Sequence, residues 1–221
     1  MNFTRIGKKW YLYVITDEQL SKGRSHAAVA KQAIDGGADV IQFRDKSASS
    51  RKLYNDALAI RKITRQTNVI FIVNDRLDIA LAVDADGVHV GQTDLPARVA
   101  RQLIGEGKIL GVSVETQQQA IQAEQDGADY LGVGPVFEAR STKPDAGEPR
   151  GLVLLKEIRH QCTMPIVAIG GINAHNAKDM IRAGADGIAV ISAIVSADDI
   201  AIASRELKEI IILERKRIEK N

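Results

Sequence analysis

The stretch IFIVNDRLDIALAVDADGVHVGQTDLP, from Ile70 to Pro96, contains two short apolar runs separated by a helical pattern. The runs IFIVN and GVHV have five and four residues and are mostly apolar on both faces, which is typical of buried parallel strands. The first run ends at Asn74-Asp75, and Asp94 follows the second. Polar residues after a buried strand either turn the chain at the surface or contact a ligand, and the rest of the sequence decides between these.

The same unit recurs along the chain. Six more runs of this kind are LYVIT, VIQFR, ILGVS, YLGVG, IVAIG and GIAVI, and amphipathic stretches such as SHAAVAKQAIDGG lie between them. Eight strand–helix alternations predict a single-domain α/β protein, a (β/α)8 TIM barrel over residues 1–221, with a charged C-terminal helix from about residue 204. A doubly wound sheet is the weaker alternative, because no GxGxxG motif opens a first helix.

A repeated phrase supports the barrel. The segments GGADVIQ, DADGVHV, DGADYLG and AGADGIA each end a helix and enter a strand, and their aspartates are separated by 47, 43 and 57 residues. Each interval spans two strand–helix units, so every second strand has the same entry signal. We interpret the phrase itself as a helix C-cap and a turn. The aspartates are Asp39, Asp86, Asp129 and Asp186.

The composition of the chain limits the kinds of partner and the cellular location that can be expected. The net charge of +2, from 30 basic and 28 acidic residues, gives no reason to expect nucleic acid or a membrane surface as a partner. The single cysteine, Cys162, excludes an internal disulfide and is expected to be a small buried hydrophobe. No apolar run is long enough for a signal sequence or a membrane span. We therefore expect a soluble protein of the cytoplasm, with homo-oligomer formation left open.

Residues at the carboxyl ends of barrel strands converge on one site, so those residues are the candidates for function. After the sixth strand the sequence has a long segment, EARSTKPDAGEPRG, on the face where long loops are usually functional. In chain order the candidates are Gln42, Arg44, Lys46, Asn74, Asp75, His89, Gln92, Asp94, Ser113, Arg140, Ser141, Thr142, Lys143, Gly170, Gly171, Ile191 and Ser192.

The alternation of side chains along QFRDK places Gln42, Arg44 and Lys46 on one side of the chain. Inward-facing cations are costly unless an anion meets them, which favours a bound phosphate group. The alternative is a structural ion pair with Asp75 or Asp94.

Asp75 and Asp94 come from neighbouring strands and are candidate ligands of one Mg²⁺ ion, a cation that prefers oxygen atoms. Next to the cations, they favour a metal-bridged pyrophosphate. The segments AIGGIN and VISAI end the last two strands, where glycines expose backbone N–H groups to a second anion or simply form tight turns. The site is thus expected to bind a pyrophosphate and a monophosphate.

The histidines add no catalytic group to this set. His89 lies within an expected strand, where a hydrogen-bonded interior histidine is at least as plausible as a general base. His26, His160 and His175 fall in expected helical segments and are interpreted as surface or packing residues. No spacing of His, Cys and acidic residues matches a zinc motif.

The sequence resembles the thiamine-phosphate synthase family. The resemblance rests on YVITD, GGADVIQFRDK, VNDRLDIALAVDADGVHVGQTDLP, GVSVET, GADYLGVGPVF, TKPDA, VAIGGIN and GADGIAVISAI, in this order between Tyr11 and Ile194. It implies a (β/α)8 transferase of thiamine biosynthesis. Such an enzyme joins 4-amino-2-methyl-5-hydroxymethylpyrimidine diphosphate to a thiazole monophosphate, with Mg²⁺, and releases pyrophosphate.

The resemblance also implies a role for each matching residue. The pyrimidine-diphosphate contacts fall on Gln42, Arg44, Lys46, Asn74, Ser113 and Lys143. The magnesium ligands fall on Asp75 and Asp94, and the thiazole-phosphate contacts on Thr142, Gly171, Ile191 and Ser192. The catalytic set is expected to be Arg44, Lys46, Ser113 and Lys143.

The loop after the sixth strand departs from the family pattern. FEARSTK is one residue longer and lacks a proline and a threonine, which leaves Arg140 or Ser141 near the position of the missing threonine. Arg140 is a candidate to bind the thiazole phosphate by charge. Two other functions are compatible with such a pocket: a related thiazole tautomerase, and a non-catalytic thiamine-phosphate binding protein.

Overall fold

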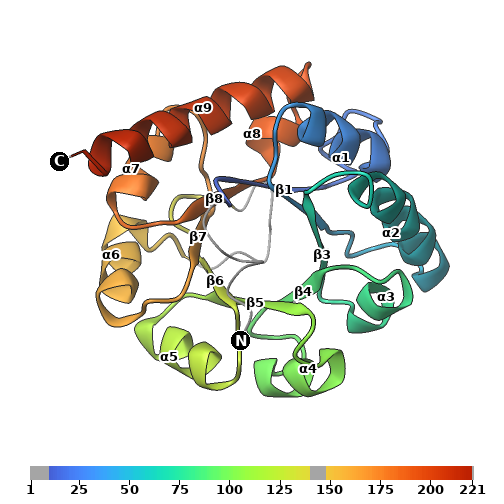
Figure 1. Cartoon of the computed structure of the whole chain (residues 1–221), viewed down its shortest axis with the longest axis horizontal. Helices are drawn as coiled ribbons and strands as arrows, with labels where there is room; N and C mark the ends of the chain where they lie inside the picture. The colour runs from blue at the N-terminus through green and yellow to red at the C-terminus, as the bar shows by residue number, and fades with distance from the viewer. Residues whose placement is uncertain (1–9, 140–147, 221) are drawn as a thin grey trace.

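The computed structural model describes residues 10–139 and 148–220, and the strands in this part of the chain form one closed parallel barrel (Figure 1). Consecutive strands are hydrogen-bonded neighbours, and β8 pairs with β1 to close the ring. The predicted (β/α)8 barrel is confirmed. The strands are β1 (Leu12–Ile15), β2 (Val40–Phe43), β3 (Ile70–Asn74), β4 (Gly87–Val90), β5 (Ile109–Val114), β6 (Tyr130–Val133), β7 (Ile166–Ile169) and β8 (Gly187–Val190).

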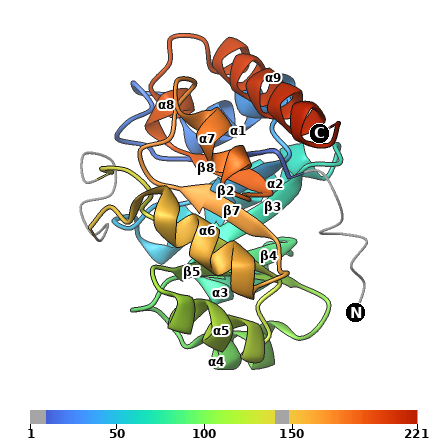
Figure 2. The same ribbon diagram turned by 90° about the vertical axis from the view of Figure 1, so that its left-hand side faces the viewer.

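Helices surround the barrel and cover the outward faces of the strands (Figures 1 and 2). The last one, α9, packs against α1 and α7, and it begins four residues before the predicted start at Ser204. The earlier start has a local cause, because the Asp199 side chain caps the helix by accepting from Ile202 N at 2.8 Å. The helices are α1 (His26–Asp35), α2 (Ser50–Thr64), α3 (Leu77–Ala82), α4 (Ala97–Ile104), α5 (Gln117–Gln125), α6 (Gly151–Gln161), α7 (Ala177–Arg182), α8 (Ser192–Val195) and α9 (Ile200–Ile218).

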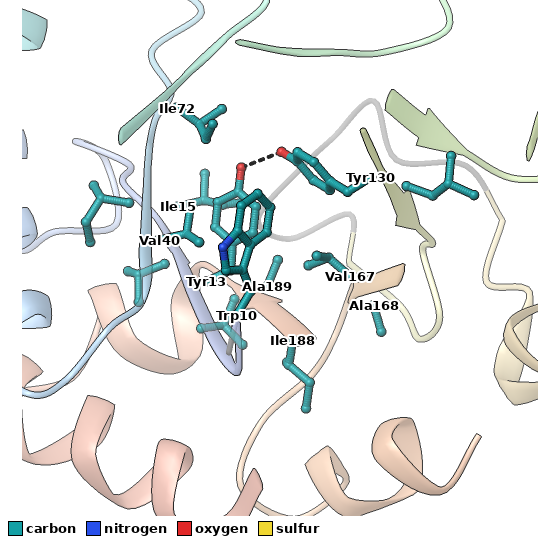
Figure 3. Packing of buried hydrophobic residues seen from close by; sticks show 14 of the residues in the cluster. Trp10, Tyr13, Ile15, Val40, Ile72, Tyr130, Val167, Ala168, Ile188 and Ala189 are labelled. Atoms are coloured by element: carbon teal, nitrogen blue, oxygen red, sulfur yellow. Dashed lines mark hydrogen bonds between the residues drawn. The ribbon is translucent and has the colours of Figure 1, made fainter. Parts of the chain in front are cut away.

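Aromatic side chains fill the centre of the barrel. Trp10, Tyr13 and Tyr130 are buried and pack edge to face or tilted, with the Trp10 and Tyr130 ring centroids 5.1 Å apart (Figure 3). Gly111 in β5 makes room for this cluster, since a Cβ atom there would overlap the Tyr130 ring. The interior is therefore a packed core, as expected for a barrel of eight strands.

The four repeated aspartates do more than end a turn, so our interpretation of the phrase was incomplete. Each one accepts a hydrogen bond from the first or second residue of the preceding strand and also pairs with a cationic side chain from a helix. Buried strand ends leave backbone donors that need a partner, and a carboxylate satisfies one while holding a helix to the barrel. The pairs are Asp39 with Leu12 N and Lys208, Asp86 with Phe71 N and Arg61, Asp129 with Leu110 N and Arg101, and Asp186 with Ile166 N and Arg159.

These contacts lie at the amino-terminal ends of the strands, the face that serves stability in this fold. The opposite face is left for function. Within residues 10–139 and 148–220, no helix is both long enough and apolar enough to cross a membrane.

Candidate active site

A cleft at the carboxyl ends of the strands consists of two lobes. Of the residues predicted to bind the diphosphate and the metal ion, all that the structure describes line the first lobe: Gln42, Arg44, Lys46, Asn74, Asp75, Asp94 and Ser113. The second lobe is lined by Gly170, Gly171, Ile191 and Ser192, again with Ser113. Because the lobes share residues, including Ser113, Glu115 and Ile191, two ligands bound in them would meet at this boundary.

The segment from β2 into the following loop presents the cations of the first lobe. Gln42 lies within β2 rather than after it, and Gln42, Arg44 and Lys46 all line the lobe, as the alternation predicted. Arg44 Nη1 lies 3.5 Å from Asp17 Oδ2, and Lys46 Nζ lies 3.7 Å from Asp75 Oδ2. The structural ion pair that we considered for Lys46 therefore exists, although its length makes it a loose contact.

The two predicted metal ligands interact directly. Asp75 has a left-handed backbone, with φ of 59°, and Asp94 Oδ2 accepts from Gly91 N at 2.7 Å. Burial, followed by the hydrogen bond and charge of Asp94, raises the pKa of Asp75 to about 6, against the opposing effect of Lys46. Two carboxylates in contact repel each other once both are ionised, and a hard divalent cation relieves that repulsion. This oxygen donor pair fits Mg²⁺.

A chain of buried hydrogen bonds forms the floor of the first lobe. Gln42 Nε2 donates to the Tyr13 hydroxyl at 2.8 Å, and this hydroxyl lies 2.8 Å from that of Tyr130 (Figure 3). His89 continues the chain, with Nδ1 2.9 Å from the Tyr130 hydroxyl and Nε2 2.8 Å from Ser113 Oγ. His89 is thus a hydrogen-bonded interior histidine, the alternative to a general base.

Sequence reasoning missed the two tyrosines of this chain, which also line the first lobe. Burial raises the pKa of both Tyr13 and Tyr130 above the usual value, so both stay protonated at neutral pH. Ser113 lies inside β5 rather than after it, and Gln92 Nε2 donates to its carbonyl oxygen at 2.6 Å. The polar chain therefore fixes the position of Ser113 from two directions.

Glu115 is a further residue that sequence reasoning missed. It follows Ser113 by two positions, so strand alternation points both toward the same side, and it lines both lobes. That spacing was the available signal. Glu115 therefore lies at the boundary where two ligands would meet.

The second lobe is shaped by glycines. Gly170 and Gly171 have φ of 102° and 63°, and a Cβ atom at Gly171 would lie 2.7 Å from both Glu138 O and Phe137 Cβ. Ser192 begins the short helix α8 on the same side. The predicted Arg140, Ser141, Thr142 and Lys143 lie outside the described residues.

The similarity of this chain to known thiamine-phosphate enzymes covers most of its length. Residues 12–194 match the family model described as thiamine monophosphate synthase. The thiamine-phosphate synthase of Chloroflexus aurantiacus is 57% identical over 94% of this chain and 95% of its own, and that of Methanocella arvoryzae is 54% identical over 90% and 94%. The solved thiamine phosphate pyrophosphorylase from Pyrococcus furiosus superposes with a TM-score of 0.87 at 43% identity, covering 96% of this chain and 98% of its own.

Proposed function

The chain belongs to the thiamine monophosphate synthase family, and we propose that it couples 4-amino-2-methyl-5-hydroxymethylpyrimidine diphosphate with a thiazole monophosphate. The products are thiamine phosphate and pyrophosphate. The observation that supports this proposal best is the two-lobed cleft, in which one lobe has cations and a carboxylate pair and the other has a glycine-rich wall. Each lobe offers the groups that one of the two substrates requires.

The first lobe is the proposed site of the pyrimidine diphosphate. Gln42 and Asn74 supply amide groups, and Arg44 and Lys46 supply positive charge for the diphosphate, with Ser113 at the inner end. Asp75 and Asp94 would hold Mg²⁺, which supplies further neutralisation of the diphosphate charge when bound. From the sequence alone, Lys143 joins this set as a contact to the leaving group.

The second lobe is the proposed site of the thiazole phosphate. Gly171, Ile191 and Ser192 line it, and backbone N–H groups and a serine hydroxyl are donors that suit an anion. Arg140, Ser141 and Thr142 are proposed contacts on sequence grounds.

The proposed reaction breaks the bond between the exocyclic methylene carbon of the pyrimidine and the diphosphate oxygen, and the electron pair leaves with pyrophosphate. The amino group of the ring feeds electrons toward the methylene carbon, and the thiazole nitrogen lone pair then forms the new C–N bond. No side-chain nucleophile is needed. Arg44 and Lys46 stabilise the departing negative charge, and the walls of the cleft align the rings and exclude water.

Glu115 contributes to the same chemistry in this proposal. Positive charge develops on the pyrimidine and ends on the thiazolium ring, and both lie at the boundary of the lobes that Glu115 lines. A carboxylate there stabilises the charge before and after the C–N bond forms. We also place the enzyme in the cytoplasm, where it acts on small molecules; homo-oligomer formation is compatible with these roles.

Incubation of the purified protein with both substrates and Mg²⁺, followed by chromatography, tests the function. Formation of thiamine phosphate and pyrophosphate in equal amounts supports it. Isomerisation of the thiazole phosphate without coupling indicates a tautomerase instead, and tight binding of thiamine phosphate without turnover indicates a binding protein. The Asp75–Asp94 pair favours the coupling reaction over the tautomerase and the binding protein, since neither of these two functions requires a metal–diphosphate site.

A further inference from the structure

His26, the first residue of α1, is buried, and one of its ring nitrogens neither accepts nor donates a hydrogen bond among the described residues. The residue is 2% exposed, and its ring packs edge-on against Phe43 with centroids 4.8 Å apart. Nδ1 lies 2.8 Å from Thr16 Oγ1, which fixes the ring. Within residues 10–139 and 148–220, Nε2 has no hydrogen-bond partner. A buried polar atom of this kind needs an explanation, such as an ion or a water molecule.

Two carboxylates lie close to this nitrogen. Asp45 Oδ2 is 3.7 Å from His26 Nε2, and with Glu18 the three ligand atoms lie within 4.8 Å of one another. The 3.7 Å separation is too long for a hydrogen bond. A metal ion at about 2.1 Å from both atoms would bridge them with an angle of roughly 120° at the ion. Glu18 is exposed, so its side chain has the freedom to complete the set.

The surroundings orient both inner ligands. Asp45 Oδ1 accepts from Ser47 N at 2.9 Å and from Ala48 N at 3.0 Å, which leaves Oδ2 directed toward His26. When Nδ1 of His26 donates to Thr16, the lone pair of Nε2 points to the same place. Outer hydrogen bonds of this type are the usual support of metal-binding histidines and carboxylates.

The local charge favours a cation despite one nearby lysine. Lys52 Nζ donates to Asp56 at 2.7 Å and to Glu18 at 3.0 Å. Glu18, Asp45 and Asp56 outnumber this single ammonium group around His26. The Lys52 side chain is 43% exposed, so it can release Glu18 and keep Asp56 as its partner.

We propose that Glu18, His26 and Asp45 bind one divalent metal ion of the zinc class, at a site separate from the substrate cleft. None of the three lines either lobe. One imidazole with two carboxylates suits Zn²⁺ or Co²⁺ better than Mg²⁺, which prefers oxygen ligands alone. Asp45 lies between Arg44 and Lys46, so a bound ion fixes the segment that presents these two cations to the first lobe.

Calorimetric titration of the full chain with Zn²⁺ in saturating Mg²⁺ tests this site. We expect one Zn²⁺ ion per chain, with affinity reduced about 10- to 100-fold in Glu18→Gln and in Asp45→Asn. The control is Asp35→Asn, which removes one carboxylate charge from the exposed Lys31–Asp35 pair of α1 without removing a ligand and should change the affinity less than about 5-fold. Asp75→Asn should leave the stoichiometry unchanged. In ¹⁵N-resolved NMR spectra, Zn²⁺ should shift the His26 Nε2 resonance.

Three results would overturn the proposal. The first is the absence of saturable Zn²⁺ binding in the presence of Mg²⁺. The second is retention of full affinity in both Glu18→Gln and Asp45→Asn. The third is loss of the bound Zn²⁺ in Asp75→Asn, which would place the ion in the substrate cleft. These measurements do not depend on turnover, so failure of the proposed coupling activity leaves them interpretable.

Discussion

The hydroxyl groups of Tyr13 and Tyr130 lie 2.8 Å apart at the centre of the barrel and join β1 to β6 across 117 residues of sequence (Figure 3). Both side chains are almost completely buried, and the pair links Gln42 on one side to His89 on the other. In such a chain each hydroxyl needs its neighbours, because a buried polar atom without a partner is costly.

Tyr130→Phe should therefore destabilise the protein. The change leaves His89 Nδ1 without its partner and takes one partner from Tyr13, so we expect a loss of about 1–3 kcal/mol in the free energy of unfolding. For a chain of this length that corresponds to a decrease in Tm of about 3–10 °C, measured by thermal denaturation. Tyr54→Phe is the control, since Tyr54 is 39% exposed and should tolerate loss of its hydroxyl. Equal Tm values for the two variants would contradict the importance of the chain.

The aspartates below the barrel allow a second comparison, between two residues of one loop. Asp86→Asn replaces a carboxylate with a neutral amide. This carboxylate accepts a hydrogen bond from Phe71 N at 2.8 Å and pairs with Arg61, whose side chain is 12% exposed. We expect a loss of about 1.5–3 kcal/mol, because the charged hydrogen bonds to a largely buried guanidinium are lost. Asp84→Asn alters an acid that is 61% exposed and should cost less than about 1 kcal/mol. Urea denaturation measures both, and a larger effect at Asp84 would show that the loop depends on its surface ion pairs.

Coupling should require a divalent cation held by Asp75 and Asp94. We expect thorough chelation to abolish turnover, and Asp75→Asn to raise the Mg²⁺ concentration needed for half-maximal rate and to lower the maximal rate, with the fold intact by circular dichroism. Asp78→Asn is the matched control, because Asp78 lies in α3, is exposed and pairs with Arg76. Full turnover after chelation, or the same Mg²⁺ dependence in both variants, would count against the assigned ligands.

We expect a glycine to be required at position 171 for two reasons: its positive φ, and the space that the absence of a side chain leaves in the second lobe. In Gly171→Ala the new methyl group meets Glu138 O and Phe137, so we expect a higher KM for the thiazole phosphate together with lower stability. Gly23→Ala provides the control, since Gly23 also has a positive φ, of 81°, but has no atom within 4 Å of a new Cβ. The control should lose stability of about 1 kcal/mol while both KM values stay unchanged. An unchanged thiazole-phosphate KM in Gly171→Ala would remove this wall from the site.

Substitutions in the loop after β6 test the roles that the sequence predicts for its residues. Lys143→Ala should lower kcat by about 10²-fold or more if Lys143 has its proposed role, since a cation that contacts the leaving group acts as negative charge develops there. If Arg140 binds the thiazole phosphate, Arg140→Ala should raise the KM of that substrate, by a factor that corresponds to about 1.5–3 kcal/mol of lost binding free energy. Arg140→Lys should restore only part of this binding free energy. If Thr142→Ala raises this KM and Arg140→Ala does not, Arg140 plays no part in binding.

The sequence by itself determined the barrel and the face that bears the candidate site. Short strands buried on both faces, with a common entry phrase at every second one, permit few arrangements other than a closed parallel barrel. Once the strands are placed, their carboxyl ends converge, so residues such as Arg44, Asp75 and Asp94 could be assigned to one cleft from their positions alone. The pattern of apolar residues did not locate the start of α9. The helix begins at Ile200 because the Asp199 side chain caps it.

Tertiary structure alone decided which distant side chains touch. The hydrogen bonds between Tyr13 and Tyr130 and between Tyr130 and His89 join β1 to β6 and β6 to β4, strands that are not consecutive in sequence. The register of the closed barrel sets the heights of these side chains. The proximity of Glu18, His26 and Asp45 depends in the same way on how the loop after β1, the start of α1 and the loop after β2 pack together. Periodicity tells which way a side chain points along its own strand, whereas contacts between strands depend on closure, stagger and packing, to which each part of the chain contributes.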